Sequence, residues 1–172
     1  MFEWLAGSND KQVSSFERGE ARAHLLDLEA TGKYVFHGSD NPNIKALEPR
    51  QPQNFPEWDK AEDDGSPCIA TARLADAAIF RALVREDRTG FGQDKNEALH
   101  LYASRTALKR VARSGYVYVL DRKKFEPRHG SPQDLEWRSE ETVTPLEVVR
   151  VTKSDLPNSI EIVSERTVKK SP

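Results

Sequence analysis

A histidine stands in this chain at a position where its side chain could meet a ligand. Three strand-forming residues, YVF at 34–36, are followed directly by His37, Gly38 and Ser39 and then by a loop broken by prolines. An imidazole at the end of a strand can bind a ligand or exchange a proton near neutral pH, but it can also simply hydrogen-bond the turn that it begins. The tripeptide alone leaves both interpretations open.

The single cysteine, Cys68, offers a second possible chemistry. A thiol paired with His37 could act as a nucleophile, because a nearby imidazole lowers the pKa of a thiol. A lone cysteine in the stretch PCIA is more typical of a small buried apolar residue. One cysteine allows no internal disulfide, and the four histidines lack the i, i+4 spacing of a helical metal pair. We therefore predict no metal site.

Composition and missing motifs narrow the class of protein. The sequence has no P-loop, no G-x-G-x-x-G after a strand and no G-x-S-x-G elbow. Its formal net charge of −2 creates no bulk attraction to nucleic acid. Clustered cations could still contact a phosphate backbone, although interspersed acidic residues favour a solvated face. These cations are Lys109, Arg110, Arg113, Arg122, Lys123 and Lys124.

The ends and apolar runs of the sequence predict a protein of the cytoplasm. The start, MFEWLAGSNDKQ, is too short and polar for the apolar region of a signal peptide. No apolar run approaches the roughly 20 residues that span a bilayer. We therefore expect no membrane partner, and the lone cysteine fits a reducing compartment.

Two helices are predicted from apolar periodicity. Ser14 and Glu17 have the spacing of a capping box, which predicts a helix at about 15–31 that ends at Gly32. Thr71 is the predicted N-cap of a second helix, after a brief apolar strand. The segment 106–115 is either a short helix or an irregular connection.

Alternating apolar residues predict at least five strands. In the best of them, GYVYVLD at 115–121, the residues at 116, 118 and 120 share one face and those at 117 and 119 share the other. The segments 37–66 and 91–96 are predicted loops. The remaining strands are predicted at 34–36, 98–104, 147–151 and 159–163.

The order of these elements predicts an α+β fold. Its sheets should be mixed or antiparallel, because a helix precedes all the strands and no regular βαβ alternation follows. The length of 172 residues fits one domain, 1–172, with frayed ends at 1–13 and 166–172.

Three separated pieces of the sequence occur in a recognisable order: YVFHGSDN, SPCIATARLADAAIFRAL and EWRSEETVTPLEVVRVTKSDLP, together covering the span of about 130 residues from the first to the last. They resemble the ADP-ribosyltransferase superfamily, in particular its poly-ADP-ribose-polymerase-like branch. That branch carries an H-G-[ST] motif on its first strand, a tyrosine on the next and a glutamate before a late strand. The resemblance implies a fold whose sheets surround a cleft that binds NAD.

The resemblance also implies roles for individual residues. His37 would bind the adenosine-ribose hydroxyls of NAD, Gly38 would meet the nicotinamide carboxamide through its backbone, and Ser39 would touch the ribose. Arg50 would reach the adenine or pyrophosphate side. Cys68 would stand where the family has a tyrosine that stacks on nicotinamide. Phe80, Tyr102 or Tyr118 could supply the missing ring.

The implied catalytic carboxylate belongs to the third piece. Glu136, Glu140 and Glu141 all precede the strand predicted at 146–151, and counting back from it favours Glu140, with Glu141 one residue away. In the family this carboxylate stabilises the cationic sugar that forms as nicotinamide leaves. The sequence does not separate Glu140 from Glu141.

Three functions follow as expectations. The first is a mono-ADP-ribosyltransferase or NAD glycohydrolase that uses NAD as a substrate and an unidentified macromolecular acceptor or water. The second is the related NAD-dependent RNA 2'-phosphotransferase reaction. The third is a degenerate member of the family that binds a nucleotide or a protein without catalysis, which Cys68 in the tyrosine position supports.

Overall fold

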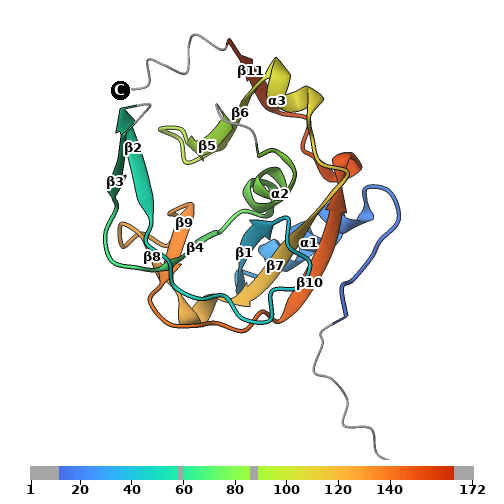
Figure 1. Cartoon of the computed structure of the whole chain (residues 1–172). Coiled ribbons are helices and arrows are strands. Elements are labelled where there is room, and N and C mark those ends of the chain that lie inside the picture. The colour runs from blue at the N-terminus through green and yellow to red at the C-terminus, as the bar shows by residue number, and fades with distance from the viewer. Residues whose placement is uncertain (1–11, 58–59, 86–88, 165–172) are drawn as a thin grey trace, which may run out of the picture.

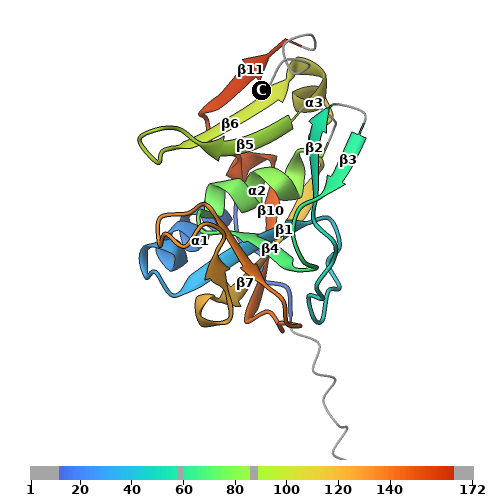
Figure 2. The same ribbon diagram turned by 90° about the vertical axis from the view of Figure 1, so that its left-hand side faces the viewer.

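Two β-sheets with a helix between them form the framework of the protein (Figure 1). The computed structural model describes residues 12–57, 60–85 and 89–164. Figure 2 shows the three-stranded sheet above helix α2 and the larger sheet below it. The helices are α1 (Glu20–Ala30), α2 (Ala75–Leu83) and α3 (Arg105–Lys109), with 3-10 turns η1 (Arg122–Lys124) and η2 (Lys153–Asp155).

Eleven strands make three sheets among the described residues. The six-stranded sheet has the order β10-β7-β1-β4-β9-β8, and all its neighbours are antiparallel. In the sheet β11-β6-β5 the first pair is parallel and the second antiparallel, and β2 and β3 form a hairpin. The strands are β1 (Tyr34–Ser39), β2 (Gln53–Glu57), β3 (Lys60–Asp63), β4 (Ile69–Ala72), β5 (Thr89–Gln93), β6 (Leu99–Ser104), β7 (Ser114–Asp121), β8 (Glu126–Pro127), β9 (Glu136–Ser139), β10 (Glu147–Thr152) and β11 (Ile160–Val163).

This architecture confirms the predicted α+β class with mixed and antiparallel sheets. The two faces predicted for β7 are also confirmed. Val117 and Val119 join the core around α2, whereas Tyr118 and Leu120 join a second core on the opposite face of the sheet. The separation follows from the period of two in a strand, because successive side chains leave opposite faces.

Helix α2 packs unusually close to the strands below it. A Cβ atom at Gly38 of β1 would lie 2.1 Å from the carbonyl oxygen of Ala78, and one at Gly115 would lie 2.4 Å from that of Ala82. Both contacts are with helix backbone, which cannot rotate away. The two glycines therefore let the backbone of α2 rest directly on β1 and β7.

The first helix begins later than predicted. Ser14 forms a β-bridge with Val149, and Gly19, with a φ of 81°, occupies the N-cap of α1 instead. The predicted capping box is wrong because the backbone of Ser14 bonds to β10, with its amide 2.8 Å from the oxygen of Val148. The predicted stop at Gly32 is confirmed, since its amide donates to the oxygen of Glu29 at 3.0 Å.

Three other local predictions are also wrong. Thr71 is not an N-cap but a residue of β4, and its hydroxyl donates to the carbonyl of Trp137 at 2.8 Å. The predicted loop at 37–66 contains the β2–β3 hairpin, and the predicted loop at 91–96 begins with the end of β5. In each case pairing with a distant or adjacent strand overrides local composition.

The termini are described only in part. Residues 1–11 and 166–172 of the predicted frayed ends lie outside the described residues. Val13 packs against the core that contains Tyr118 and Leu120. No helix in the described ranges is both long enough and apolar enough to cross a bilayer.

Candidate active site

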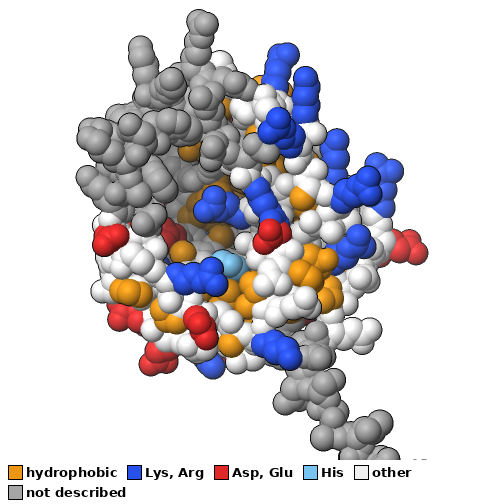
Figure 3. All heavy atoms as spheres, viewed as in Figure 1, with side chains coloured by type: hydrophobic (Ala, Val, Ile, Leu, Met, Phe, Trp, Pro, Cys, Tyr) orange, Lys and Arg blue, Asp and Glu red, His pale blue; other side chains and the backbone are white. Residues whose placement is uncertain are grey.

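A pocket of about 660 Å³ opens between the two sheets beside α2. Its walls come from β1, β4 and β9 of the large sheet, from α2 and from β5 of the small sheet. Figure 3 shows a hollow in this face of the molecule with basic side chains around it. The volume lies within the range of small-molecule sites in proteins.

The pocket opens where strands β1 and β4 separate. Their registered pairing is limited to Phe36 and Ala72, although β1 continues to Ser39. His37 lies just beyond that pair, inside β1 and opposite Tyr118 of β7, so the predicted strand end at 36 is too early. The Nδ1 atom of His37 is 3.1 Å from the carbonyl oxygen of Ala70 in β4. The imidazole thus bridges the gap between the two strands.

The surroundings of His37 favour its neutral form. Burial lowers the pKa of His37, and the positive charges of Arg81 and Arg50 lower it further, while the hydrogen bond to Ala70 opposes them. Because a carbonyl only accepts, Nδ1 carries the proton that it donates to Ala70. The Nε2 atom of the neutral ring is then an acceptor, suited to a ligand hydroxyl.

The lowered pKa of His37 predicts a pH-dependent contribution to stability. The unfolded chain binds a proton at His37 near the usual pKa of 6.5, and the folded chain does so only at lower pH. Stability from the neutral ring is therefore fully present above about pH 6.5 and declines as the pH falls toward the folded-state pKa. Urea unfolding of the wild type and His37→Gln from pH 5 to 7.5 measures this. We expect the variant to lose less stability on acidification, and parallel curves would contradict the assignment.

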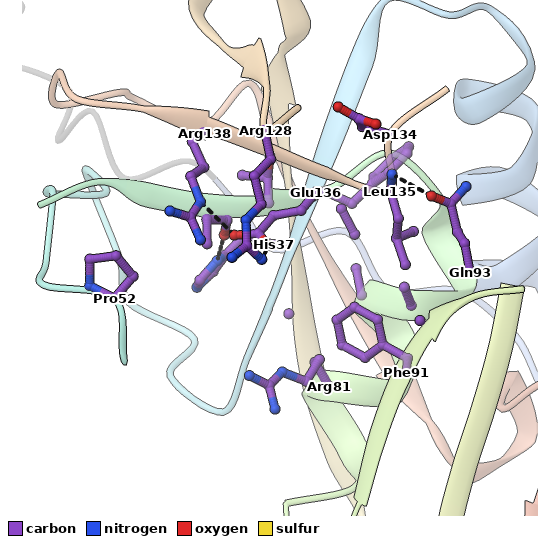
Figure 4. A pocket seen from close by; sticks show the side chains of 18 of the residues that line it. His37, Pro52, Arg81, Phe91, Gln93, Arg128, Asp134, Leu135, Glu136 and Arg138 are labelled. Carbon is purple, nitrogen blue, oxygen red and sulfur yellow. Dashed lines mark hydrogen bonds and ion pairs between the residues drawn. The ribbon is translucent and has the colours of Figure 1, made fainter. Parts of the chain in front are cut away.

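Four charged side chains form a closed network on one wall of the pocket. The Glu136 carboxylate accepts from Nε of Arg138 at 2.7 Å and from Nη1 of Arg128 at 2.8 Å. Asp64 accepts from the same two guanidinium groups, at 2.6 Å from Arg128 and 2.9 Å from Arg138. Hydrogen bonding from Arg138 is the largest of the effects that lower the pKa of Asp64. The network is neutral overall, and it fixes Glu136 in position (Figure 4).

A cation and an aromatic ring lie on another wall of the pocket. The guanidinium carbon of Arg81, on α2, is 5.6 Å from the ring centroid of Phe91, on β5. This distance is within the range of a cation–π contact. Arg81 forms no ion pair with a carboxylate in the described part of the chain. The pair supplies a positive charge and an aromatic face to a bound ligand (Figure 4).

The structure brings only two of the predicted ligand-binding residues into this pocket. His37 and Gly38 line it. Ser39 instead accepts a hydrogen bond from the amide of Asn41 at 3.1 Å, and Arg50 pairs with Cys68 through backbone hydrogen bonds of 2.9 and 3.0 Å. None of these three residues is among the described residues that line the pocket, although the charge of Arg50 acts on His37.

Cys68 lacks the surroundings of a nucleophile. The side chain is buried, and this burial raises the pKa of its thiol, which disfavours the thiolate. Ala70, two residues further along β4, lies on the pocket wall. This part of β4 therefore presents a methyl group to the pocket, and the phenylalanine rings in the lining are Phe36, which is fully buried, and Phe91. Phe80 and Tyr118, two of the rings considered from sequence, are fully buried in the two cores.

The only glutamate among the described lining residues is Glu136, not one of the two favoured from sequence. Glu140 and Glu141 are exposed in the bend after β9, and neither is among the described lining residues. Counting back from β10 missed this because the carboxylate belongs to a separate short strand, β9, which pairs with β4. In that strand Glu136 and Arg138 share one face, and Trp137 and Ser139 are buried on the other.

The described part of the chain holds no group of three or more His, Cys, Asp or Glu side chains arranged to bind a metal ion. The pocket chemistry available in this structure is therefore that of two imidazoles (His37 and His129), three carboxylates (Asp64, Asp134 and Glu136), three guanidinium groups and two phenylalanine rings (Phe36 and Phe91). The guanidinium groups belong to Arg81, Arg128 and Arg138.

Comparison with known proteins adds no relative. No family model matches the chain, and neither a curated protein nor a solved structure matches it significantly. The resemblance to ADP-ribosyltransferases therefore stays a prediction from the three sequence pieces.

Sequence reasoning missed most of the pocket wall. Arg81 lies in the second sequence piece but has no role assigned by the resemblance, Asp64 and Phe91 lie in the predicted loops 37–66 and 91–96, and no element is predicted around Arg128. Glu136 is one of three glutamates that precede the late strand, but counting back from that strand favours Glu140. The one available signal was the alternation E-x-R at 136–138, which is typical of a short strand with a charged face.

Proposed function

We propose that the chain binds NAD in this pocket and cleaves its nicotinamide–ribose bond, as a mono-ADP-ribosyltransferase or an NAD glycohydrolase. The observation that carries the proposal is that His37, the first element of the H-G-S motif, shares a pocket with a glutamate from the third sequence piece. These two residue types, from segments about 100 positions apart, are the pair that the resemblance requires.

Besides Glu136, four of the lining residues have roles in this proposal. Nε2 of the neutral His37 accepts a hydrogen bond from a ribose hydroxyl. The guanidinium of Arg81 binds the pyrophosphate, and the Phe91 ring offers a face for nicotinamide in place of the family's tyrosine. Gly38 lines the pocket beside His37, where its backbone can meet the nicotinamide carboxamide.

Glu136 stabilises the positive charge that develops on the sugar as neutral nicotinamide leaves. The two arginines occupy one acceptor position on each of its oxygens. A carboxylate has about four such positions, so Glu136 can still accept a hydrogen bond from the substrate. Because the arginines fix the carboxylate, it needs little rearrangement when the charge forms.

The same ion pairs favour a second candidate function, a nucleotide-binding module without catalysis. Arg128 and Arg138 neutralise the negative charge that Glu136 would offer to a cationic sugar. In that case the pocket would bind NAD and leave the glycosidic bond intact.

Nicotinamide release from NAD, measured together with the thermal shift that NAD causes, tests the proposal. We expect the wild type to show both. His37→Ala should raise KM for NAD by about tenfold, because it removes one hydrogen bond to the ribose. A thermal shift without nicotinamide release would support the binding module, and the absence of both would refute both functions.

A further inference from the structure

A strip of basic side chains lies beside the pocket on α3 and on the chain that follows it. We define this basic strip as Arg105, Lys109, Arg110 and Arg113, all of which are exposed. No aspartate or glutamate occurs between residues 98 and 120. Figure 3 shows Lys and Arg side chains gathered over this part of the surface. This segment of the chain therefore carries four positive charges and no carboxylate, although the whole chain is slightly acidic.

The fold holds this strip in a fixed place. Helix α3 is capped by the hydroxyl of Ser104, which accepts from the amide of Ala107 at 3.1 Å, and Ala107 itself is buried in the core. After α3, the amide of Ala112 donates to the carbonyl of Leu83 at 3.0 Å, at the end of α2. Leu83 is two residues beyond Arg81 on the pocket wall, so the strip leads to the pocket.

We propose that the basic strip binds the phosphate backbone of a single-stranded nucleic acid. Three of its four cations are arginines, whose planar forks match phosphate oxygens. Its apolar residues, Leu108 and Val111, pack against the core and leave no exposed anchor of the kind that protein interfaces use. A single strand fits better than a duplex, because its unpaired bases are free to enter the adjoining pocket of about 660 Å³ when NAD is absent. The proposal concerns binding alone and does not depend on cleavage of NAD.

The second basic stretch seen in the sequence lies elsewhere and supplies a matched control. Lys123 and Lys124 are exposed on η1, beyond the far end of β7 from Arg113. The eight residues of β7 place these ends about 25 Å apart. Removing two charges there changes the net charge of the protein by the same amount as removing two from the strip.

Fluorescence anisotropy with a labelled 20-nucleotide single-stranded DNA of mixed sequence, and with the RNA of the same sequence, tests the proposal in the absence of NAD. Each phosphate contact contributes a slope of about −0.7 to log K against log salt, so four contacts should weaken binding about 50-fold between 50 and 200 mM KCl. For Lys109→Gln/Arg113→Gln we expect binding to weaken only about 7-fold over the same salt range, because two phosphate contacts remain. For Lys123→Gln/Lys124→Gln we expect the same weakening of about 50-fold as for the wild type. Since all four residues are exposed, the thermal midpoints of the variants should match that of the wild type.

Three results would overturn the proposal. The first is that neither oligonucleotide binds at 50 mM KCl. The second is that the two double variants lose the same amount of affinity for the oligonucleotides. The third is that a poly-glutamate chain of the same length binds as tightly as the oligonucleotides do. The last result would assign the strip to an acidic protein. Loss of binding in the strip variant with unchanged nicotinamide release would confirm it and leave the proposed function of the pocket intact.

Discussion

Replacing Gly38 with alanine is expected to destabilise the protein by at least about 3 kcal/mol, the upper range for overpacked cores. The new Cβ would lie 2.1 Å from the carbonyl oxygen of Ala78 and 2.8 Å from the amide nitrogen of Ala82. Both atoms belong to the backbone of α2, so relief requires the whole helix to move away from β1. Urea unfolding monitored by far-UV circular dichroism measures the loss.

Gly92→Ala is the matched control for this prediction. It also adds one methyl group to a strand on the pocket wall, but a Cβ at Gly92 would meet no atom within 4 Å. We expect its stability to equal or slightly exceed that of the wild type, because alanine loses less backbone entropy than glycine on folding. Similar stability of the Gly38 and Gly92 variants would mean that α2 does not rest on β1 as described.

The packing of α2 against β1 therefore requires a glycine at position 38, whether or not the protein binds a ligand. In the family resemblance the glycine is expected to meet the nicotinamide through its backbone. The close approach of α2 would exclude a side chain at this position even in a protein that binds no nucleotide. The glycine of the H-G-S tripeptide is thus explained by packing, and activity measurements on His37 variants are the cleaner test of function.

Replacing Glu136 with glutamine is expected to lower the rate of nicotinamide release about 10²–10³-fold, on the basis of the proposed function. The glutamine keeps the shape of the side chain but removes the negative charge where positive charge develops on the sugar. Because the effect arises in the transition state, we expect kcat to fall and KM for NAD to change little. Steady-state kinetics of nicotinamide release measures both quantities.

Glu140→Gln separates this assignment from the one that the sequence favoured. Glu140 is exposed beyond the end of β9, so its replacement should leave kcat unchanged. If Glu140→Gln abolished release and Glu136→Gln did not, the role given to Glu136 would be wrong. Urea unfolding of Glu136→Gln belongs with the kinetics, because this variant also loses two ion pairs with Arg128 and Arg138.

The elements with strong local patterns could be predicted from sequence. The alternation at 115–121 gave both the strand β7 and the two faces that its side chains occupy. A local pattern suffices there because a strand that is buried on both faces has apolar side chains at successive positions, and these define both the strand and its two faces. The helix around 20–30 was also found, but its start was not, because Ser14 bonds to β10 rather than to the helix.

Only part of the site could be predicted from the sequence, and the physical reason differs from that for the helix start. His37 and Gly38 lie in one short motif, so their shared place in the pocket needed only one local prediction. Glu136, Arg81 and Phe91 lie on three other elements, β9, α2 and β5, and no local pattern states which of these elements meet. The β4–β9 pairing selects Glu136 over Glu140, since it ends at Ser139 and leaves Glu140 in solvent.

The sequence by itself determined the α+β class, the strands at 98–104, 115–121, 147–151 and 159–163, and the importance of the stretch that contains His37. Those features depend on side-chain periodicity and backbone preference, which act within a few residues. Only the tertiary structure decided that His37 is a half-buried residue within β1 that bridges to β4, that Glu136 shares its pocket, and that one basic stretch adjoins the pocket while the other lies across the sheet. These depend on strand pairing and helix packing between residues far apart in the chain, which a local pattern does not specify.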